Sequence, residues 1–302
     1  MKYEEIEREV QSLLGLAEPV SGTRRRDALR MALGAGLGVG YASAAGVVMA
    51  QTAIKTAADG LTAGEVGIDV KGFKLPAYRA MPEGKQNLPV VLVISEIFGV
   101  HEYIADTCRR LAQAGYMAIA PDLFVRQGDP MVYGETAKLM SEVISKVPDA
   151  QVMGDLDAAV QWAGANGGDT SKLAITGFCW GGRITWLYAA HAPVKAGVAW
   201  YGRLQGNKSD LQPAHPIDLV SRLKAPVLGL YGGQDSGIPL TSVEAMKAAL
   251  KSGSAAAKAS EFVIYPDAPH AFHADYRPSY SEQAAMDGWR RMLDWLRLHG
   301  VA

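Results

Sequence analysis

Cysteine is scarce in this chain, which has only Cys108 and Cys179 among its 302 residues. Two cysteines cannot build the set of disulfides that holds small secreted domains together. The sequence also lacks the C-x-x-C and H-E-x-x-H spacings of common metal sites, so it predicts neither a metal nor another cofactor. Disulfide-rich and metal-dependent classes of protein are therefore disfavoured.

The chain also has almost no net charge. The formal charge is −1 at pH 7, and no basic stripe with interleaved aromatic residues follows residue 54. Proteins that bind nucleic acid usually carry such a stripe, so no nucleic-acid partner is expected. With 49% hydrophobic residues, 20% charged residues and no internal repeat, the chain can bury one sizeable core.

Residues 1–54 are predicted to be an export signal region. A basic cluster at residues 24–30 precedes an uncharged run, residues 31–54, made largely of Ala, Gly, Leu and Val. A basic head followed by a moderately apolar run is typical of export signals. The run is also long enough to span a bilayer, so a retained membrane anchor is the alternative. Its many glycines lower its hydrophobicity and favour a cleaved signal.

The basic cluster resembles the twin-arginine signal, with Arg25 and Arg26 as the pair and Ala28 where phenylalanine is usual. This resemblance implies export to the periplasm, with cleavage expected after Ala44 or Ala50. A polar linker is predicted at residues 55–63, and the folded domain at residues 64–302.

Strands and helices alternate through the folded domain. Two alternating segments predict an antiparallel pair, and continuous apolar runs predict strands covered on both faces. The fold class is therefore α/β, with a mostly parallel central sheet and helices on both faces. Strands are expected at 64–70, 73–80, 89–95, 116–120, 172–178, 196–201, 226–231 and 261–265, and helices at 101–114, 134–146, 149–165, 240–251 and 279–298.

The segment 172–183 has the pattern of a nucleophile elbow. It is a β-branched run that ends in Gly177-Phe178-Cys179-Trp180-Gly181 and continues as a helix. In such a turn the central residue is held over the edge of the sheet, and small flanking residues let the backbones pass. A helix N-terminus also favours a thiolate. Cys179 is therefore the candidate nucleophile; a buried cysteine beside a glycine turn is the alternative.

Two further residues complete a candidate triad. Asp235 follows the strand at 226–231, and His270 follows the strand at 261–265. Side chains at the carboxyl ends of parallel strands gather at one edge of the sheet. His270 is predicted to be the base and Asp235 its orienting acid, in the chain order of α/β hydrolases. Asp267 and His273 are the nearest substitutes, and a capping aspartate and a surface histidine are the alternatives.

From about Gly64 to the C-terminus the chain resembles the dienelactone hydrolase (carboxymethylenebutenolidase) family of the α/β-hydrolase superfamily. The resemblance implies that Glu96 contacts the resting thiol and keeps it from being a permanent thiolate. It also implies that the backbone N–H groups of Ile97 and Trp180 form the oxyanion hole. The matching segments are 95–100, 120–124, 177–182, 231–235 and 269–272.

The same resemblance implies two arginines for an anionic substrate. Arg126 matches the first, whereas Ala274 occupies the place of the second and Arg277 lies nearby. Arg126 and Arg277 are thus the candidate substrate-binding residues, and solvated loop charges are the alternative. Four aromatic residues either wall the pocket or pack in the core: Tyr133, Trp200, Tyr201 and Tyr276.

The expected function is a carboxylic ester hydrolase that opens lactones or cleaves activated esters through a thioester on Cys179. A general carboxylesterase of the same fold is one alternative, and a redox-sensing or binding module without catalysis is another. The partner is a small-molecule ester or lactone, with no prediction of an oligomer. Cys108 is expected to be buried and inert in the helix at 101–114.

Overall fold

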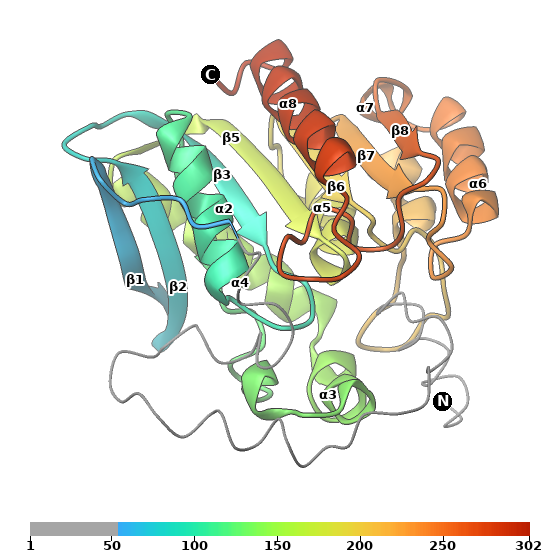
Figure 1. Cartoon of the computed structure of the whole chain (residues 1–302), viewed down its shortest axis with the longest axis horizontal. Helices are drawn as coiled ribbons and strands as arrows, with labels where there is room; N and C mark the ends of the chain where they lie inside the picture. Colours follow the sequence, from blue (N-terminus) through green and yellow to red (C-terminus); the bar gives the residue numbers. More distant parts are fainter. Residues whose placement is uncertain (1–53) are drawn as a thin grey trace.

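The computed structural model describes residues 54–302, so the predicted export signal lies outside the described residues apart from Ile54. Eight strands of this region form one sheet (Figure 1). The strands are β1 (Leu61–Val70), β2 (Phe73–Pro82), β3 (Leu88–Ile94), β4 (Met117–Pro121), β5 (Gly168–Phe178), β6 (Ala196–Trp200), β7 (Val227–Gly232) and β8 (Glu261–Tyr265).

The sheet is mostly parallel, as predicted. Its order is β1-β2-β4-β3-β5-β6-β7-β8. β4, β3 and β5 to β8 pair in parallel, and the β1–β2 hairpin extends the sheet through antiparallel pairing of β2 with β4. The central strands β3, β4, β6 and β7 consist almost wholly of buried residues. Helices on both faces account for this burial.

Helices cover both faces of the sheet. In Figure 1, α2 and α8 lie in front of the sheet, and α4 and α5 lie behind it. No helix within residues 54–302 is both long enough and apolar enough to cross a membrane. The helices are α2 (Glu102–Gln113), α3 (Thr136–Glu142), α4 (Asp149–Ala165), α5 (Trp180–His191), α6 (Leu240–Lys251), α7 (Ala255–Lys258) and α8 (Glu282–Leu298), with 3-10 helices η2 (Pro130–Val132), η3 (Ile144–Lys146) and η4 (Pro216–Arg222).

Most predicted elements are found within a few residues of their expected bounds. The helix expected at 134–146 is instead divided into α3 and η3, because Val143 leaves the helical conformation with φ −121° and ψ −67°. The last helix begins at Glu282 rather than near residue 279. Residues before it form turns, in which the N–H of Arg277 donates to Ala274 and that of Tyr280 to Arg277.

The linker predicted at 55–63 differs from the structure. β1 already begins at Leu61, paired with Pro82. Before it, Thr56 is bonded through its N–H to Asp106 of α2 and through its C=O to Arg109. Backbone groups of this segment pair with the charged side chains of α2, a contact that composition alone does not reveal.

Cys108 is fully buried on the inner side of α2. Burial raises the pKa of its thiol well above the ordinary value, so the thiol stays protonated at neutral pH. Cys108 and Cys179 are both free, and no disulfide joins them.

A Gly181→Ala substitution should destabilise the fold, because a Cβ there would lie 2.3 Å from the carbonyl oxygen of Ile94 and 2.6 Å from that of Ser95. We expect the free energy of unfolding to fall by about 3 kcal/mol, measured by chemical denaturation. Gly154→Ala is the matched control, since a Cβ at this exposed position in α4 meets nothing within 4 Å. It should raise the same free energy by about 0.5–1 kcal/mol. Equal effects of the two substitutions would contradict this account.

Candidate active site

Cys179 lies in a sharp turn between β5 and α5. Its backbone has φ 54° and ψ −112°, a conformation that non-glycine residues rarely adopt. The turn is so tight that a Cβ on Gly177 would lie 2.2 Å from the carbonyl oxygen of Gly181. Cys179 is the N-cap of α5, and its side chain is 4% exposed. The thiol therefore stands at the positive end of a helix dipole, shielded from most of the solvent.

Asp235 and His270 meet at the carboxyl edge of the sheet, where β7 and β8 end. His270 Nδ1 lies 2.7 Å from Asp235 Oδ2, and both side chains are buried. The other carboxylate oxygen, Oδ1, accepts hydrogen bonds from the backbone N–H groups of Gly237 at 2.9 Å and Ile238 at 3.1 Å. These bonds fix the carboxylate and, through it, the orientation of the imidazole ring.

The protonation of His270 is coupled to Cys179. Burial alone would lower the pKa of His270, but the negative charge of Cys179 and the bonded carboxylate of Asp235 outweigh it and raise the pKa to about 10. The Nε2 atom of the ring is buried and, because Nδ1 faces Asp235, it is the ring nitrogen left to interact with Cys179. A histidine whose raised pKa keeps it protonated at neutral pH can give a proton to a neighbouring group.

The substitutes Asp267 and His273 are placed elsewhere. Asp267 is exposed. His273 packs against Phe178 and Trp200 in the core, and its Nδ1 lies 2.7 Å from the hydroxyl of Tyr103. Burial, helped by the nearby charge of Arg110, lowers the pKa of His273 to about 3. His273 is therefore a neutral core residue.

Glu96 follows β3 and is held by two residues that motif matching missed. The Oε1 atom accepts a hydrogen bond from Tyr276 at 2.7 Å and lies 3.2 Å from His101 Nε2. Burial would raise the pKa of Glu96, but the charge and hydrogen bond of His101 and the bond from Tyr276 outweigh it and lower the pKa. The Oε2 atom is buried and lacks a partner in residues 54–302. The expected contact with the thiol is not among the hydrogen bonds of Glu96.

The N–H groups of Ile97 and Trp180 lie at the ends of adjacent strands. β3 and β5 are paired, with Ile94 opposite Gly177. Ile97 follows the end of β3 by three residues, and Trp180 follows the end of β5 by two. The close approach of Gly181 to Ile94 and Ser95 brings the two turns together. Two N–H groups from neighbouring turns are the usual composition of an oxyanion hole in α/β hydrolases.

The two candidate arginines occupy different surroundings. Arg126 makes a two-point ion pair with Asp155 of α4, at 2.6 and 2.9 Å, and its guanidinium lies over the Phe73 ring. Arg277 lies 5.9 Å from the Phe98 ring centroid, and its charge acts on the hydroxyls of Tyr201 and Tyr276. Of the two, Arg277 is the one placed among residues around Glu96.

The aromatic residues left open by the sequence have separate roles. Trp200 is fully buried, with its indole N–H donating to Thr176 at 3.1 Å. Tyr201 lies edge-on to His270 with ring centroids 5.1 Å apart, and its buried hydroxyl interacts with that of Tyr103. Tyr276 anchors Glu96.

His101 had no signal in the sequence beyond its place five residues after Glu96. In residues 54–302, no group of three or more His, Cys, Asp or Glu side chains is arranged to hold a metal.

The model of the dienelactone hydrolase family matches residues 75–300. This chain belongs to the dienelactone hydrolase family. A relative in Methylorubrum extorquens, provisionally named carboxymethylenebutenolidase, is 58% identical over 90% of this chain and 94% of its own length. A relative of the same provisional name in Escherichia coli is 54% identical over 86% of this chain and 96% of its own length.

Solved structures agree with this membership. The crystal structure of a provisional dienelactone hydrolase from Klebsiella pneumoniae matches with 56% identity and a TM-score of 0.76, covering 78% of this chain and 98% of that chain. An acylaminoacyl peptidase of Pyrococcus horikoshii matches with 16% identity and a TM-score of 0.62, covering 78% of this chain and 41% of that chain. The second match shows likeness of fold alone.

A Cys179→Ser substitution should lower the pKa of His270, because a serine hydroxyl is neutral and removes the negative charge that raises this pKa. In the unmodified protein, the stabilisation due to the imidazolium should be complete below the ordinary value of 6.5 and lost as the pH rises through about 10. NMR titration of the histidine ring protons measures the pKa of His270 in the unmodified protein and in Cys179→Ser. Asp267→Asn, at an exposed carboxylate, should change nothing. An unshifted His270 midpoint in Cys179→Ser would refute the coupling.

Proposed function

We propose that this dienelactone hydrolase relative opens lactones or cleaves activated esters by nucleophilic catalysis at Cys179. The observation that carries the proposal is the buried Asp235–His270 pair beside a cysteine in the strained conformation of a nucleophile elbow. A cysteine that only filled the core would need neither this backbone strain nor a base with a buried carboxylate partner.

In the first step the Cys179 thiolate attacks the acyl carbon. The carbonyl electrons move to oxygen, and the N–H groups of Ile97 and Trp180 stabilise the oxyanion that forms. The intermediate then expels the alcohol or enolate, which takes the proton of the His270 imidazolium. A thioester on Cys179 and a neutral His270 remain.

In the second step water hydrolyses the thioester. Acylation removes the negative charge from Cys179, and with it one of the two charges that raise the pKa of His270. The imidazole is then a suitable base: it takes a proton from water as the hydroxide adds to the acyl carbon. The tetrahedral intermediate then expels the Cys179 thiolate and releases the carboxylic acid. The proton taken from water stays on His270, where Asp235 stabilises it, so the starting imidazolium and thiolate are restored.

Leaving-group chemistry limits the substrates. A thiolate is itself a good leaving group, so the tetrahedral intermediate goes forward only when the other group leaves at least as readily. Enol-lactones and aryl esters satisfy this condition, whereas amides do not. We therefore expect turnover of lactones and activated esters and none of peptides, which distinguishes the chain from a general peptidase of the same fold.

Arg277 is our preferred residue for an anionic group on the substrate. It lies close to Tyr276 and Phe98, at the rim of the cluster around Glu96. Arg126 remains a candidate, but it contacts a substrate only by sharing or releasing Asp155, since two of its N–H groups already donate to that carboxylate.

Two alternatives remain. A general carboxylesterase would share the triad and differ in its preferred acyl group. A redox-sensing or binding module would need only the thiol, so the ordered Asp235–His270 pair favours an enzyme.

A Cys179→Ala substitution should abolish hydrolysis of p-nitrophenyl acetate and of a dienelactone, with kcat falling at least about 10³-fold, because no thioester can form. In the unmodified enzyme, mass spectrometry after rapid acid quenching should show the acyl group on the peptide containing Cys179. Cys108→Ala is the matched control, and it should keep kcat and KM because Cys108 is buried away from the reaction. Turnover that survives in Cys179→Ala would contradict the mechanism.

We also propose export by the twin-arginine route, on the grounds of Arg25, Arg26 and the apolar run that follows them. This route carries folded proteins, so the burial of Cys108 would be complete before the chain meets an oxidising compartment.

Thiol counting checks this proposal. Protein isolated from the exported fraction should react with a maleimide once per chain when native, at Cys179, and twice when denatured, because Cys108 is fully buried. A single thiol after denaturation, or a disulfide between the two cysteines found by mass spectrometry, would show that the chain is oxidised after export.

A further inference from the structure

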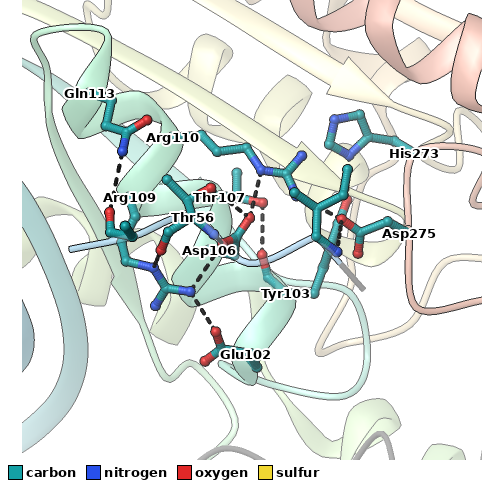
Figure 2. A network of polar contacts seen from close by, with 12 residues as sticks. Thr56, Glu102, Tyr103, Asp106, Thr107, Arg109, Arg110, Gln113, His273 and Asp275 are labelled. Atoms are coloured by element: carbon teal, nitrogen blue, oxygen red, sulfur yellow. Dashed lines mark hydrogen bonds and ion pairs between the residues drawn. The ribbon is translucent and has the colours of Figure 1, made fainter. Parts of the chain in front are cut away.

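Residues 54–57, which we call the strap, bind along α2 and its neighbouring loop. The strap belongs to no helix or strand, yet its backbone is held at several points (Figure 2). The N–H of Thr56 donates to Asp106 Oδ1 at 2.5 Å, and its C=O accepts from Arg109 Nε at 2.9 Å. Gln113 donates to the C=O of Ala57 at 3.2 Å. Three residues of α2 thus bind main-chain atoms of the strap.

The strap also reaches across to the loop after β8. The N–H of Ile54 donates to Asp275 Oδ2 at 3.3 Å. The same oxygen accepts from Arg110 Nη2 at 2.6 Å, and Arg110 Nε donates to Asp106 Oδ2 at 2.6 Å. Asp106 and Asp275 are 0% and 2% exposed. The strap therefore supplies donors to two buried carboxylates that Arg110 bridges, and buried carboxylates are costly when they lose a donor.

Asp275 lies in the segment that carries the candidate base. We define the base loop as residues 266–277, from the end of β8 to Arg277. It contacts α2 at two points, His273 with Tyr103 and Asp275 with Arg110. The groups of the site flank these two contacts in the chain. His270 precedes both of them, and Tyr276, which holds Glu96, directly follows Asp275. The strap and the base loop share one buried network.

We propose that the strap is a positioning element for the base loop: by holding Asp106 and Asp275, it fixes the path of the chain between His270 and Tyr276. The strap precedes residues 75–300, the part of the chain that the family model matches. Processing of the export signal after Ala44 or Ala50 leaves the strap in the mature chain. The proposal depends on the proposed function only for its activity measurement.

Thr56→Pro in the full chain tests the proposal, because proline lacks the N–H that donates to Asp106. Hydrogen–deuterium exchange is the readout, followed at the amides of Ala274 and Arg277, which close turns in the base loop. We expect exchange at these amides to rise on the order of tenfold, with no change in β6. Lys55→Pro is the matched control: no hydrogen bond of the described structure uses the N–H of Lys55, so the base loop should keep its protection.

Two results would overturn the proposal. One is faster exchange in Thr56→Pro that is confined to the strap and α2. This result would mean that the strap only attaches residues 54–57 to α2 and does not act on the base loop. The other is an equal effect of Lys55→Pro, which would assign the change to proline stiffness rather than to the lost donor.

Ester hydrolysis gives the second readout. Thr56→Pro should lower kcat/KM for p-nitrophenyl acetate about tenfold through kcat, because His270 is less well positioned. Thr56→Ala should stay near the unmodified enzyme, since it keeps the N–H and loses only the hydroxyl bond to Asp106 at 3.3 Å. An unaltered kcat in Thr56→Pro would refute the positioning role. If the unmodified protein hydrolyses no ester, the proposed function fails, while the exchange experiment still decides the role of the strap.

Discussion

The site depends on one close contact, in which the turn between β5 and α5 packs against the end of β3. Backbone packs directly on backbone there, because no side chain fits between Gly181 and the carbonyl groups of Ile94 and Ser95. The contact brings the N-terminus of α5 beside the turn that carries Glu96 and Ile97. It also holds Cys179 at a positive φ, a strain of roughly 1–3 kcal/mol that the surrounding packing offsets.

The central part of the site could be predicted from chain order. Parallel strands end at one edge, so residues that follow β5, β7 and β8 were expected to gather there, and Asp235 and His270 do meet. His270 was preferred to His273 as the base because it follows the strand at 261–265 more closely, but the different surroundings of the two histidines could not be predicted. Ala271, at φ 59°, turns the chain between them, so that His270 pairs with Asp235 while His273 packs into the core.

Long-range polar pairing was the other part that the sequence left open. Arg126 was predicted from a family motif, but nothing in the local sequence shows that Asp155, on a later helix, pairs with it. Residues 55–57 of the strap were predicted to be part of a polar linker. Its order comes from α2, whose charged side chains bind main-chain atoms, and such contacts leave no periodic pattern in the sequence.

The position of β8 at the edge of the sheet has a consequence for the newly made chain. β8 is the last strand in both sequence and space, and it pairs only with β7. During synthesis the elbow can form before either β8 or His270 has left the ribosome. Until β8 and the residues after it are added, Cys179 has no imidazole beside it. The contact between His270 and Asp235 at the edge of the sheet therefore forms only after the strand and helix that carry Cys179 have been made.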